Sequence, residues 1–372
     1  MSSKPALAIL DDYLSISQKH FAHIPSEYIR VDVFDDAISA QSVPGDRSSP
    51  VNPELIKRLQ PYTAILAMRE RTALPGDLLR ALPNLKVIFT TGAQFRSFDL
   101  VTAKELGIRM ATATGKGRTD GKGIQVHRKI DPKKGGVHPT TQHTWALILA
   151  LANRVVQDDN AVKAGNWQGG LMTALAGKTI GIVGLGKLGG AVARIAVVAW
   201  GMKVICWSSS LTQEKADETA RSFGLDPDQD GAKTFRVVEK PELFRTADVV
   251  SIHYVLSDRS RGIVGKEELD FMKPTAFLVN TSRGPLVNEG ALLDVLERGK
   301  IQGAAFDVFP VEPLPADSPW RSQKWGTEGR STLLTTPHMG YVEEQTLNAW
   351  YAETAENVER WLDGQELLNP VL

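Results

Sequence analysis

Short apolar stretches alternate with amphipathic ones along the first third of the chain. Runs rich in alanine, β-branched and aromatic residues between turn residues predict strands. They are "PALAILDD", "YIRVDVF", "YTAILAM", "LKVIFTTGA" and "GIRMATAT", at 5–12, 28–34, 62–68, 85–93 and 107–114. Residues 52–60 and 75–83 have apolar positions at helical spacing and a proline near the start, so they predict helices. Strands that alternate with helices indicate a parallel α/β layer.

A second α/β run begins at residue 177. Residues 177–207 predict a strand, a glycine-rich turn, a helix and a second strand, and further strands are predicted within 247–256, 276–282, 301–309 and 333–338. Long helices are predicted at 139–156 and 343–364. Two runs of this kind predict an α/β fold built from two Rossmann-like open parallel-sheet domains.

Between the two runs lies "GKGRTDGKGIQVHRKIDPKKGGV", residues 115–137, with many glycines, a basic excess and few apolar residues. This composition predicts a solvated, mobile loop whose deletion over 117–135 leaves the fold intact. The alternative is an arm that becomes ordered at a hinge or a subunit contact. The stretch has no tryptophan, tyrosine or phenylalanine for stacking on bases, which argues against a nucleic-acid patch.

Composition excludes several classes of protein. Lys plus Arg and Asp plus Glu both number 43 in 372 residues, so no net charge attracts the chain to nucleic acid or to a membrane. Apolar residues make up 42% and charged residues 23%, as in globular proteins. Cys206 is the single cysteine, so no internal disulfide forms. The start "MSSKPALAIL" does not resemble a signal peptide. We therefore expect a soluble, cytoplasmic protein without nucleic-acid or membrane partners.

The turn "GLGKLG" has the spacing of a dinucleotide-binding fingerprint. Gly184 permits the tight turn, Gly186 lets the backbone approach a pyrophosphate, and Gly189 lets helix and strand pack closely. An apolar strand precedes the turn, a helix follows it, and a second strand comes next. This context predicts a nicotinamide dinucleotide rather than a glycine-rich turn without a ligand.

An acidic residue is missing where NAD-binding proteins normally carry one. About 20 residues after such a turn, an Asp or Glu hydrogen-bonds the adenosine ribose. Here Trp207 is followed by Ser208, Ser209 and Ser210. No carboxylate repels a 2′-phosphate at this place, and the hydroxyls can donate to one. We expect NADP(H) to be preferred, with NAD(H) possible and Lys215 as the nearest downstream cation. Alternatively, the serines cap the following helix and cofactor choice is loose.

Three charged side chains follow three later strands. Arg283 comes after "FLVN", Glu312 after "AAFDVF", and His338 after "LLTTP". Side chains at the carboxyl ends of parallel strands project over one crevice. An arginine can hold a carboxylate, a histidine can move a proton near neutral pH, and a glutamate can orient that histidine.

The chain resembles the D-isomer-specific 2-hydroxyacid dehydrogenase family, of the glyoxylate/hydroxypyruvate reductase kind. The resemblance rests on "GIVGLGKLGG", "ADVVSIHYVLSDRSRGIVG", "MKPTAFLVNTSRGPLVNEGALLDVLERGKIQGAAFDVFPVEPLP" and "TTPHMGY". It covers the chain from about residue 5 onwards, apart from 115–137. It implies that Arg283 binds a 2-oxo acid and polarises its keto group, that His338 is the acid/base, and that Glu312 is its partner.

The resemblance also implies binding residues and a domain arrangement. It places the substrate near Arg69, Gly92 and Ala93, and the cofactor near Gly184, Gly186, Lys187, Leu188, Gly189, Trp207, Ser208, Ser209, Ser210, Tyr254, Val255, Thr281, Asp307 and Gly340. Residues 1–138 and 338–372 would form a substrate-binding domain and 139–337 a dinucleotide-binding domain, separated by a cleft. Phe95, Arg96 and Gln142 depart from the family's usual residues and leave the identity of the substrate open.

We therefore expect a homodimeric 2-oxo acid reductase that makes D-2-hydroxy acids and needs no metal. Two alternatives use the same fold: a corepressor-like protein that senses the dinucleotide, and a phosphite dehydrogenase. Formate dehydrogenases carry a glutamine beside the catalytic histidine, so Glu312 argues against that activity.

Overall fold

The chain folds into two compact units, each described by itself. In the computed structural model, residues 4–46, 48–126, 138–229 and 231–372 are described. Unit 1 comprises residues 1–134 and 342–372, and unit 2 comprises residues 135–341. The predicted α/β class is confirmed, because each unit is built around a parallel sheet.

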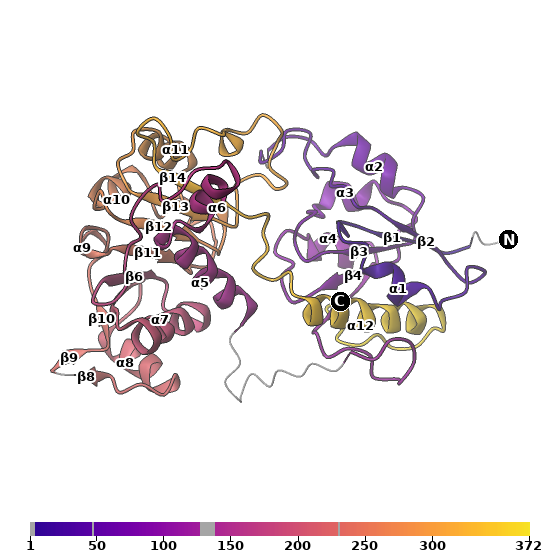
Figure 1. Ribbon diagram of the computed structural model, residues 1–372. Helices are drawn as coiled ribbons and strands as arrows, with labels where there is room; N and C mark the ends of the chain where they lie inside the picture. The colour runs from indigo at the N-terminus through magenta and orange to yellow at the C-terminus, as the bar shows by residue number, and fades with distance from the viewer. Residues whose placement is uncertain (1–3, 47, 127–137, 230) are drawn as a thin grey trace. The chain divides into compact units, whose positions relative to one another are not determined.

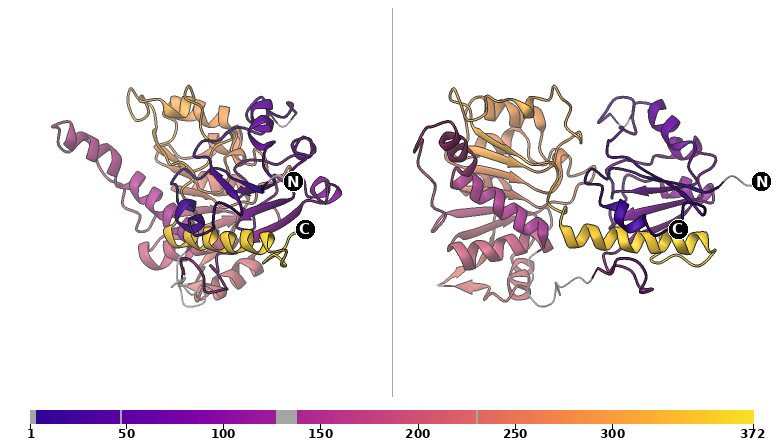
Figure 2. Two further views of the ribbon diagram at one scale, coloured as in Figure 1. Left: turned by 90° about the vertical axis from the view of Figure 1, so that its right-hand side faces the viewer. Right: turned by 45° about the vertical axis from the view of Figure 1, so that its right-hand side comes forward.

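Unit 1 contains five parallel strands in the order β2-β1-β3-β4-β5. All five strands that the sequence predicts are present. Helix α12 lies along one face of this sheet together with α1, and it contacts β4 and β5 (Figures 1 and 2). The elements are β1 (Ala6–Ile9), α1 (Ser17–Phe21), β2 (Arg30–Val33), α2 (Pro53–Leu59), β3 (Ala64–Ala67), α3 (Gly76–Arg80), β4 (Val87–Thr91), α4 (Leu100–Glu105), β5 (Arg109–Ala113) and α12 (Glu344–Leu362).

Unit 2 contains seven parallel strands in the order β10-β7-β6-β11-β12-β13-β14. The strands are β6 (Thr179–Val183), β7 (Lys203–Trp207), β10 (Phe235–Val237), β11 (Val249–Ile252), β12 (Phe277–Asn280), β13 (Gly303–Phe306) and β14 (Thr332–Thr335). A short antiparallel hairpin, β8 (Asp228–Gln229) and β9 (Ala232–Lys233), lies outside this sheet. The chain order reverses between β6 and β11, which is where open α/β sheets bind ligands.

Helices cover both faces of the unit 2 sheet. Side chains that alternate along a strand point to opposite faces, so Ile180 and Ile182 of β6 pack with α5 and α7 while Val183 packs with α9, α10 and α11. Burial on both faces explains the near-continuous apolar strands. The helices are α5 (Pro139–Ala152), α6 (Val155–Lys163), α7 (Lys187–Trp200), α8 (Gln213–Ser222), α9 (Lys240–Thr246), α10 (Lys266–Phe271) and α11 (Glu289–Glu297), with 3₁₀ turns η2 (Gly284–Leu286) and η3 (Pro319–Arg321).

The continuous helix predicted over 139–156 is wrong. Helix α5 ends at Ala152, and Arg154 adopts a left-handed conformation with φ of 55° before α6 begins. Asn153 is the C-cap residue, and a left-handed residue beyond the cap ends a helix by breaking its hydrogen-bond series. Helix α6 buries none of its residues, so no apolar stripe continues from α5.

The first part of the 115–137 segment is not a solvated loop, which corrects the prediction. Glu353 of α12 accepts hydrogen bonds from the backbone N–H groups of Gly115 and Lys116. Glu356 accepts from the backbone and the hydroxyl of Thr119. The side chain of Arg118 is 1% exposed and pairs with Asp120 at 2.6 Å and with Glu359. Residues 127–137 lie outside the described part of the chain.

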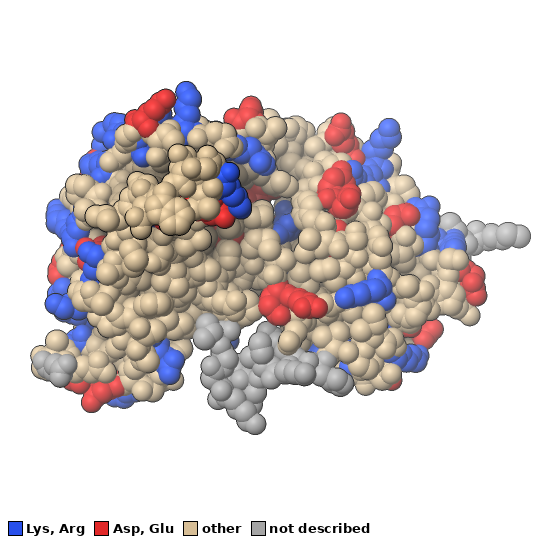
Figure 3. All heavy atoms as spheres, in the orientation of Figure 1, with Lys and Arg blue, Asp and Glu red and all other residues tan. Residues whose placement is uncertain are grey.

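The surface in Figure 3 carries acidic and basic side chains on both units, in keeping with the equal totals of the two kinds. None of the helices within the described residues is long and apolar enough to cross a membrane.

Replacing Arg118 with Ala tests the docking of this segment on α12. The change leaves the carboxylates of Asp120 and Glu359 without their shared guanidinium. We expect a loss of about 2 kcal/mol in the free energy of unfolding, because partly buried charges lose their partner. Urea denaturation measures it, with Lys122→Ala in the same segment as the exposed control. Equal stability of the two variants would contradict the docking, and a 117–135 deletion is now expected to destabilise unit 1.

Candidate functional site

The glycine turn after β6 is open toward solvent at one glycine and closely packed at the others. Gly184 has φ of 97°, and a Cβ there would lie 2.8 Å from the carbonyl oxygen of His253. A Cβ at Gly189 would lie 2.1 Å from the carbonyl oxygen of Gly184. Beside Gly186 a Cβ would meet no atom within 4 Å. The turn therefore has the shape expected for a pyrophosphate, with open space at Gly186.

Helix α7 begins directly at this turn. Lys187 is its first residue and Gly186 its N-cap, so the first N–H groups of α7, from Lys187, Leu188 and Gly189, have no helical acceptor. These donors and the helix dipole favour an anion. The predicted phosphate-binding residues thus lie together in unit 2.

The serine loop, defined as residues 208–210, follows β7 beside the turn. Gly184 N donates to the carbonyl oxygen of Trp207 at 2.8 Å, which fixes the end of β7 against the glycine turn. The idea that these serines cap the next helix is wrong, because Thr212 is the N-cap of α8. Within the described structure, the hydroxyl groups of Ser208 and Ser210 form no hydrogen bond with protein. They remain able to donate to a ligand.

Tyr254 reaches the serine loop from the end of β11. Its hydroxyl lies 2.8 Å from Ser209 Oγ, and its ring stacks with that of Trp207 at 6.0 Å between centroids. Lys240, the first residue of α9, places Nζ 5.4 Å from the centroid of the Trp207 ring. These side chains border the place that an adenosine would take. Val255, also predicted there, is exposed.

Arg283, Glu312 and His338 follow β12, β13 and β14, which are neighbours in the sheet. Parallel pairing puts the carboxyl ends of these strands at the same edge. His338 Nδ1 lies 2.6 Å from Glu312 Oε2, while Glu312 Oε1 accepts from the backbone N–H of Phe309 at 2.8 Å. The glutamate is thereby fixed at both oxygens, and it fixes the imidazole ring.

The loops of Arg283 and Glu312 are in close backbone contact. A Cβ at Gly284 would lie 2.1 Å from the carbonyl carbon of Phe309, so only glycine fits beside it. Asn280 donates from its side chain to the carbonyl oxygen of Arg283 at 3.0 Å. The Arg283 side chain donates to the carbonyl oxygen of Ser282 at 2.7 Å.

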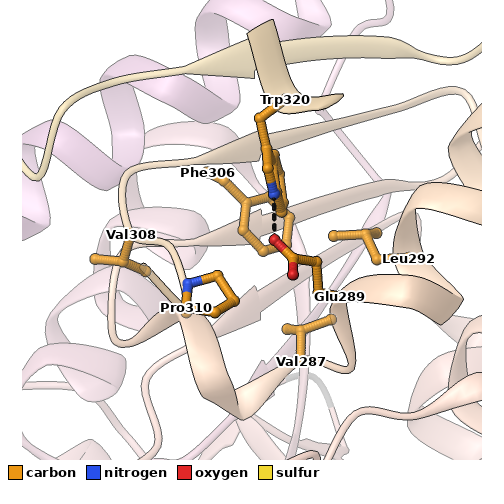
Figure 4. Close-up of a pocket in the computed structure, with 8 residues that line it drawn as sticks. Val287, Glu289, Leu292, Phe306, Val308, Pro310 and Trp320 are labelled. Carbon is orange, nitrogen blue, oxygen red and sulfur yellow. Dashed lines mark hydrogen bonds between the residues drawn. The ribbon is translucent and has the colours of Figure 1, made fainter. Parts of the chain in front are cut away.

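A small, mainly apolar pocket lies behind these loops (Figure 4). Trp320 packs on Phe306 and Phe309, with ring centroids 5.1 Å apart in both pairs. Its Nε1 donates to Glu289 at 2.6 Å, the bond drawn in Figure 4. This packing supports the loops that carry Arg283 and Glu312. The lining residues are Gly284, Val287, Glu289, Leu292, Phe306, Val308, Pro310 and Trp320.

Asp307 organises the turn that carries His338. Its side chain is fully buried, and Oδ1 accepts from Thr336 Oγ1 at 2.6 Å and from Met339 N at 2.7 Å. Gly340 N donates to Oδ2 at 2.9 Å, and His143 Nε2 lies 3.1 Å from Oδ1. Burial would raise the pKa of Asp307, but these hydrogen bonds outweigh it and leave the pKa below its usual value.

The remaining predicted cofactor residues lie around this turn. Thr281 shares a 2.7 Å hydrogen bond with Thr144 of α5, and the carbonyl oxygen of Gly340 accepts from Thr140. His338 has φ of 55°, an uncommon value for a residue other than glycine. The turn therefore holds the histidine in a conformation that its surroundings impose.

The predicted substrate residues lie at the carboxyl edge of the unit 1 sheet. Arg69 follows β3 with φ of 55°, and Gly92 follows the adjacent β4 with φ of 70°. The guanidinium of Arg69 lies 5.9 Å from the ring centroid of Trp350, and a Cβ at Gly92 would lie 3.2 Å from the same side chain. Ala93 is exposed beside them.

Sequence reasoning missed several residues at these edges. His143 stands next to Gln142, and in the sequence only Gln142 departs from the family's usual residue. Lys240 is distant in sequence from the glycine turn, and Trp350 from Arg69 and Gly92, so no local motif includes either residue. Asp11, after β1, is 3% exposed: Thr72 donates to Oδ2 at 2.8 Å, whereas Oδ1 has no hydrogen-bond partner in the described structure. Burial raises the pKa of Asp11 to about 6.

The sequence and fold match one family over most of the chain. Residues 8–120 match the catalytic domain, and residues 145–340 the NAD binding domain, of the D-isomer specific 2-hydroxyacid dehydrogenases. Both matches fall within single units of the structure.

Named relatives agree with this match. A glyoxylate reductase of Aeropyrum pernix is 34% identical over 323 residues, 82% of this chain and 84% of the relative. A D-3-phosphoglycerate dehydrogenase of Archaeoglobus fulgidus is 29% identical over 86% of this chain, which spans only 53% of that protein. The crystal structure of a phosphoglycerate oxidoreductase from Vibrio cholerae o395 superposes with a TM-score of 0.75 at 31% identity, covering 97% of this chain and 99% of that one.

The fold and the matched regions thus define an oxidoreductase with a nicotinamide cofactor. The chain belongs to the D-isomer specific 2-hydroxyacid dehydrogenase family. That family acts on small 2-hydroxy and 2-oxo acids.

Asp11→Asn should change how stability depends on pH. A carboxyl whose pKa is about 6 when folded and 3.8 otherwise costs no stability below pH 3.8. The cost grows as pH rises through 6 and reaches about 3 kcal/mol above it. Urea denaturation should therefore show wild type losing stability relative to Asp11→Asn between pH 4 and 7. The exposed Asp77→Asn serves as control, and parallel pH profiles for wild type and Asp11→Asn would contradict the assignment.

Proposed function

We propose that the protein reduces a small 2-oxo acid to the D-2-hydroxy acid. The observation that carries this proposal is the 2.6 Å contact between His338 Nδ1 and Glu312 Oε2. Because Nδ1 is engaged by Glu312, Nε2 is the nitrogen that exchanges a proton with the substrate oxygen. Glu312 also fixes the orientation of the imidazole ring, which gives Nε2 a defined direction for this transfer.

Arg283 would hold the substrate while His338 protonates it. A guanidinium can bind a carboxylate through two parallel hydrogen bonds and can polarise a neighbouring keto oxygen. The nicotinamide supplies the hydride to the keto carbon when it is bound. His338 supplies the proton to the keto oxygen, so the product is the hydroxy acid. The resemblance to the family also assigns Arg69, Gly92 and Ala93 of unit 1 to substrate binding, and the proposal keeps that assignment.

In the same proposal, Asp307 acts through the turn that it holds. Its carboxylate oxygens accept hydrogen bonds from Met339 and Gly340, the residues directly after His338. Asp307 is therefore proposed as a positioning residue for His338, in addition to its expected place at the nicotinamide end. A homodimer and a cytoplasmic location stay predictions from the sequence.

We further propose that NADP(H) is preferred over NAD(H). The serine loop carries no carboxylate that would repel a 2′-phosphate, and Thr212 rather than a serine caps α8. Ser208 and Ser210 therefore keep their hydroxyls for a ligand. The glycine turn and the first turn of α7 would hold the pyrophosphate.

His338→Ala tests the catalytic assignment. Loss of general acid catalysis should lower kcat by about 10²–10⁴-fold, with glyoxylate and hydroxypyruvate as substrates. Dinucleotide binding, measured by calorimetry, should remain near that of wild type. Arg283→Ala should instead raise KM and lower kcat together, because it also holds the substrate. Wild-type turnover by His338→Ala would disprove the mechanism, and no turnover by wild type on any 2-oxo acid would favour the corepressor-like alternative.

Ser208→Asp tests the cofactor assignment. The new carboxylate can accept from the ribose hydroxyls of NADH and would repel the 2′-phosphate of NADPH. The ratio of kcat/KM for NADPH to that for NADH should therefore invert. Ser222→Asp, at the far end of α8, controls for added charge. A wild type that already uses NADH with the higher kcat/KM would refute the preference and leave the family assignment intact.

A further inference from the structure

A cation from outside the fingerprint region lies beside the ring of Trp207, the residue that precedes the serine loop. Strand β10 pairs with β7, and Val238 N donates to the carbonyl oxygen of Cys206 at 3.1 Å. Lys240 comes two residues later, so its backbone passes the carboxyl end of β7. Its ammonium lies 5.4 Å from the centroid of the Trp207 ring, next to Ser208 in the chain. No dinucleotide motif includes this lysine.

We propose that Lys240 selects the cofactor by binding the 2′-phosphate of NADP(H). The inference rests on the proposed preference for NADP(H) and names the charged residue behind it. An ammonium can donate three hydrogen bonds, and the 2′-phosphate of a dinucleotide lies at the end of the second strand of the fold, here β7. Dedicated NADP sites use an arginine near this loop to bind the 2′-phosphate, and Lys240 would have that role here.

Glu268 holds Lys240 in place, although its negative charge is unfavourable for a bound phosphate. Its Oε1 lies 2.8 Å from Lys240 Nζ, while its Oε2 accepts from Gly265 N at 2.7 Å. The side chains of Lys240 and Glu268 are 23% and 13% exposed, so the pair is less screened by water than a surface pair. The carboxylate orients the ammonium and uses one of its donors. It also offsets part of the positive charge that a phosphate meets.

The other cations near the loop are less suited to this task. Lys215 is exposed, and its Nζ lies 3.5 Å from the carbonyl oxygen of Ser210. Arg236 is paired with Glu242 at 2.9 Å and is exposed. Lys240 differs from both because its side chain is partly buried and its ammonium lies beside the Trp207 ring at the end of β7. Glu239, exposed next to Lys240, is the nearest acidic residue in the chain and would weaken a phosphate site.

Calorimetric titration with two nucleotides tests this role without turnover. The probes are adenosine 2′,5′-bisphosphate and 5′-AMP, which differ only in the 2′-phosphate. Lys240→Met keeps the aliphatic stem and removes the charge, Lys240→Arg keeps the charge, and Lys215→Met is the matched control. Glu268→Gln removes the opposing charge and keeps one acceptor oxygen, which can serve either Lys240 or Gly265.

Lys240→Met should weaken the bisphosphate about tenfold or more and change 5′-AMP by less than about twofold, as loss of a charge-assisted hydrogen bond requires. Lys240→Arg should retain most of the affinity, Glu268→Gln should raise it, and Lys215→Met should lower it by less than about threefold. Equal weakening of both probes by Lys240→Met, or no weakening, would overturn the role of Lys240. A wild type that binds both probes equally would refute the NADP(H) preference itself, which separates the two failures.

Discussion

The site depends on one buried carboxylate. Asp307 follows β13 directly, and its two oxygens accept hydrogen bonds from both sides of the 336–340 turn. A fully buried carboxylate is stable only when such donors surround it. The turn depends on Asp307 in return. His338 has a left-handed backbone, and the hydrogen bonds from Met339 and Gly340 to Asp307 stabilise that conformation. The position of His338, the proposed acid/base, thus depends on the buried carboxylate of Asp307.

The order of the parallel strands brings the proposed catalytic residues to one edge of the sheet. In the sequence, His338 comes 55 positions after Arg283, with Glu312 between them. In the fold, the three residues follow three neighbouring strands. Aromatic packing of Trp320 behind the loops and the close approach of Gly284 to Phe309 restrict how far these loops can shift. On the other side of the β6–β11 reversal, the glycine turn and the serine loop form a separate, more polar region. One sheet edge therefore carries the residues proposed to bind the pyrophosphate and, further along, those proposed to transfer the proton.

Much of this arrangement could be predicted from the sequence, because it depends on local patterns. Apolar β-rich runs located the strands, and the order of motifs located Gly184, Arg283, Glu312 and His338. The break at Arg154 could not be predicted, since nothing in an apolar helical pattern marks a left-handed residue. The docking of Arg118 was hidden as well, because its partner Glu359 lies 241 residues away. Lys240 was missed for the same reason, because β10 must pair with β7 to bring it beside Trp207.

Unit 1 is built from two separate stretches of the chain, and this affects how the protein folds while the ribosome synthesises it. Residues 135–341 are synthesised as one block and can complete their own sheet and core early. The first sheet is made before that block, yet α12 covers its face, and Val371 and Leu372 donate from their backbone N–H groups to the carbonyl of Met110 in β5. The earlier half therefore emerges with one apolar face of its sheet uncovered. This is the face of Val87 and Phe89, since Ile88 and Met110 point to the other face and pack with α2, α3 and α4. The sheet of unit 1 thus finishes folding last. Translation speed and chaperone access while α12 is made would govern the yield of folded protein.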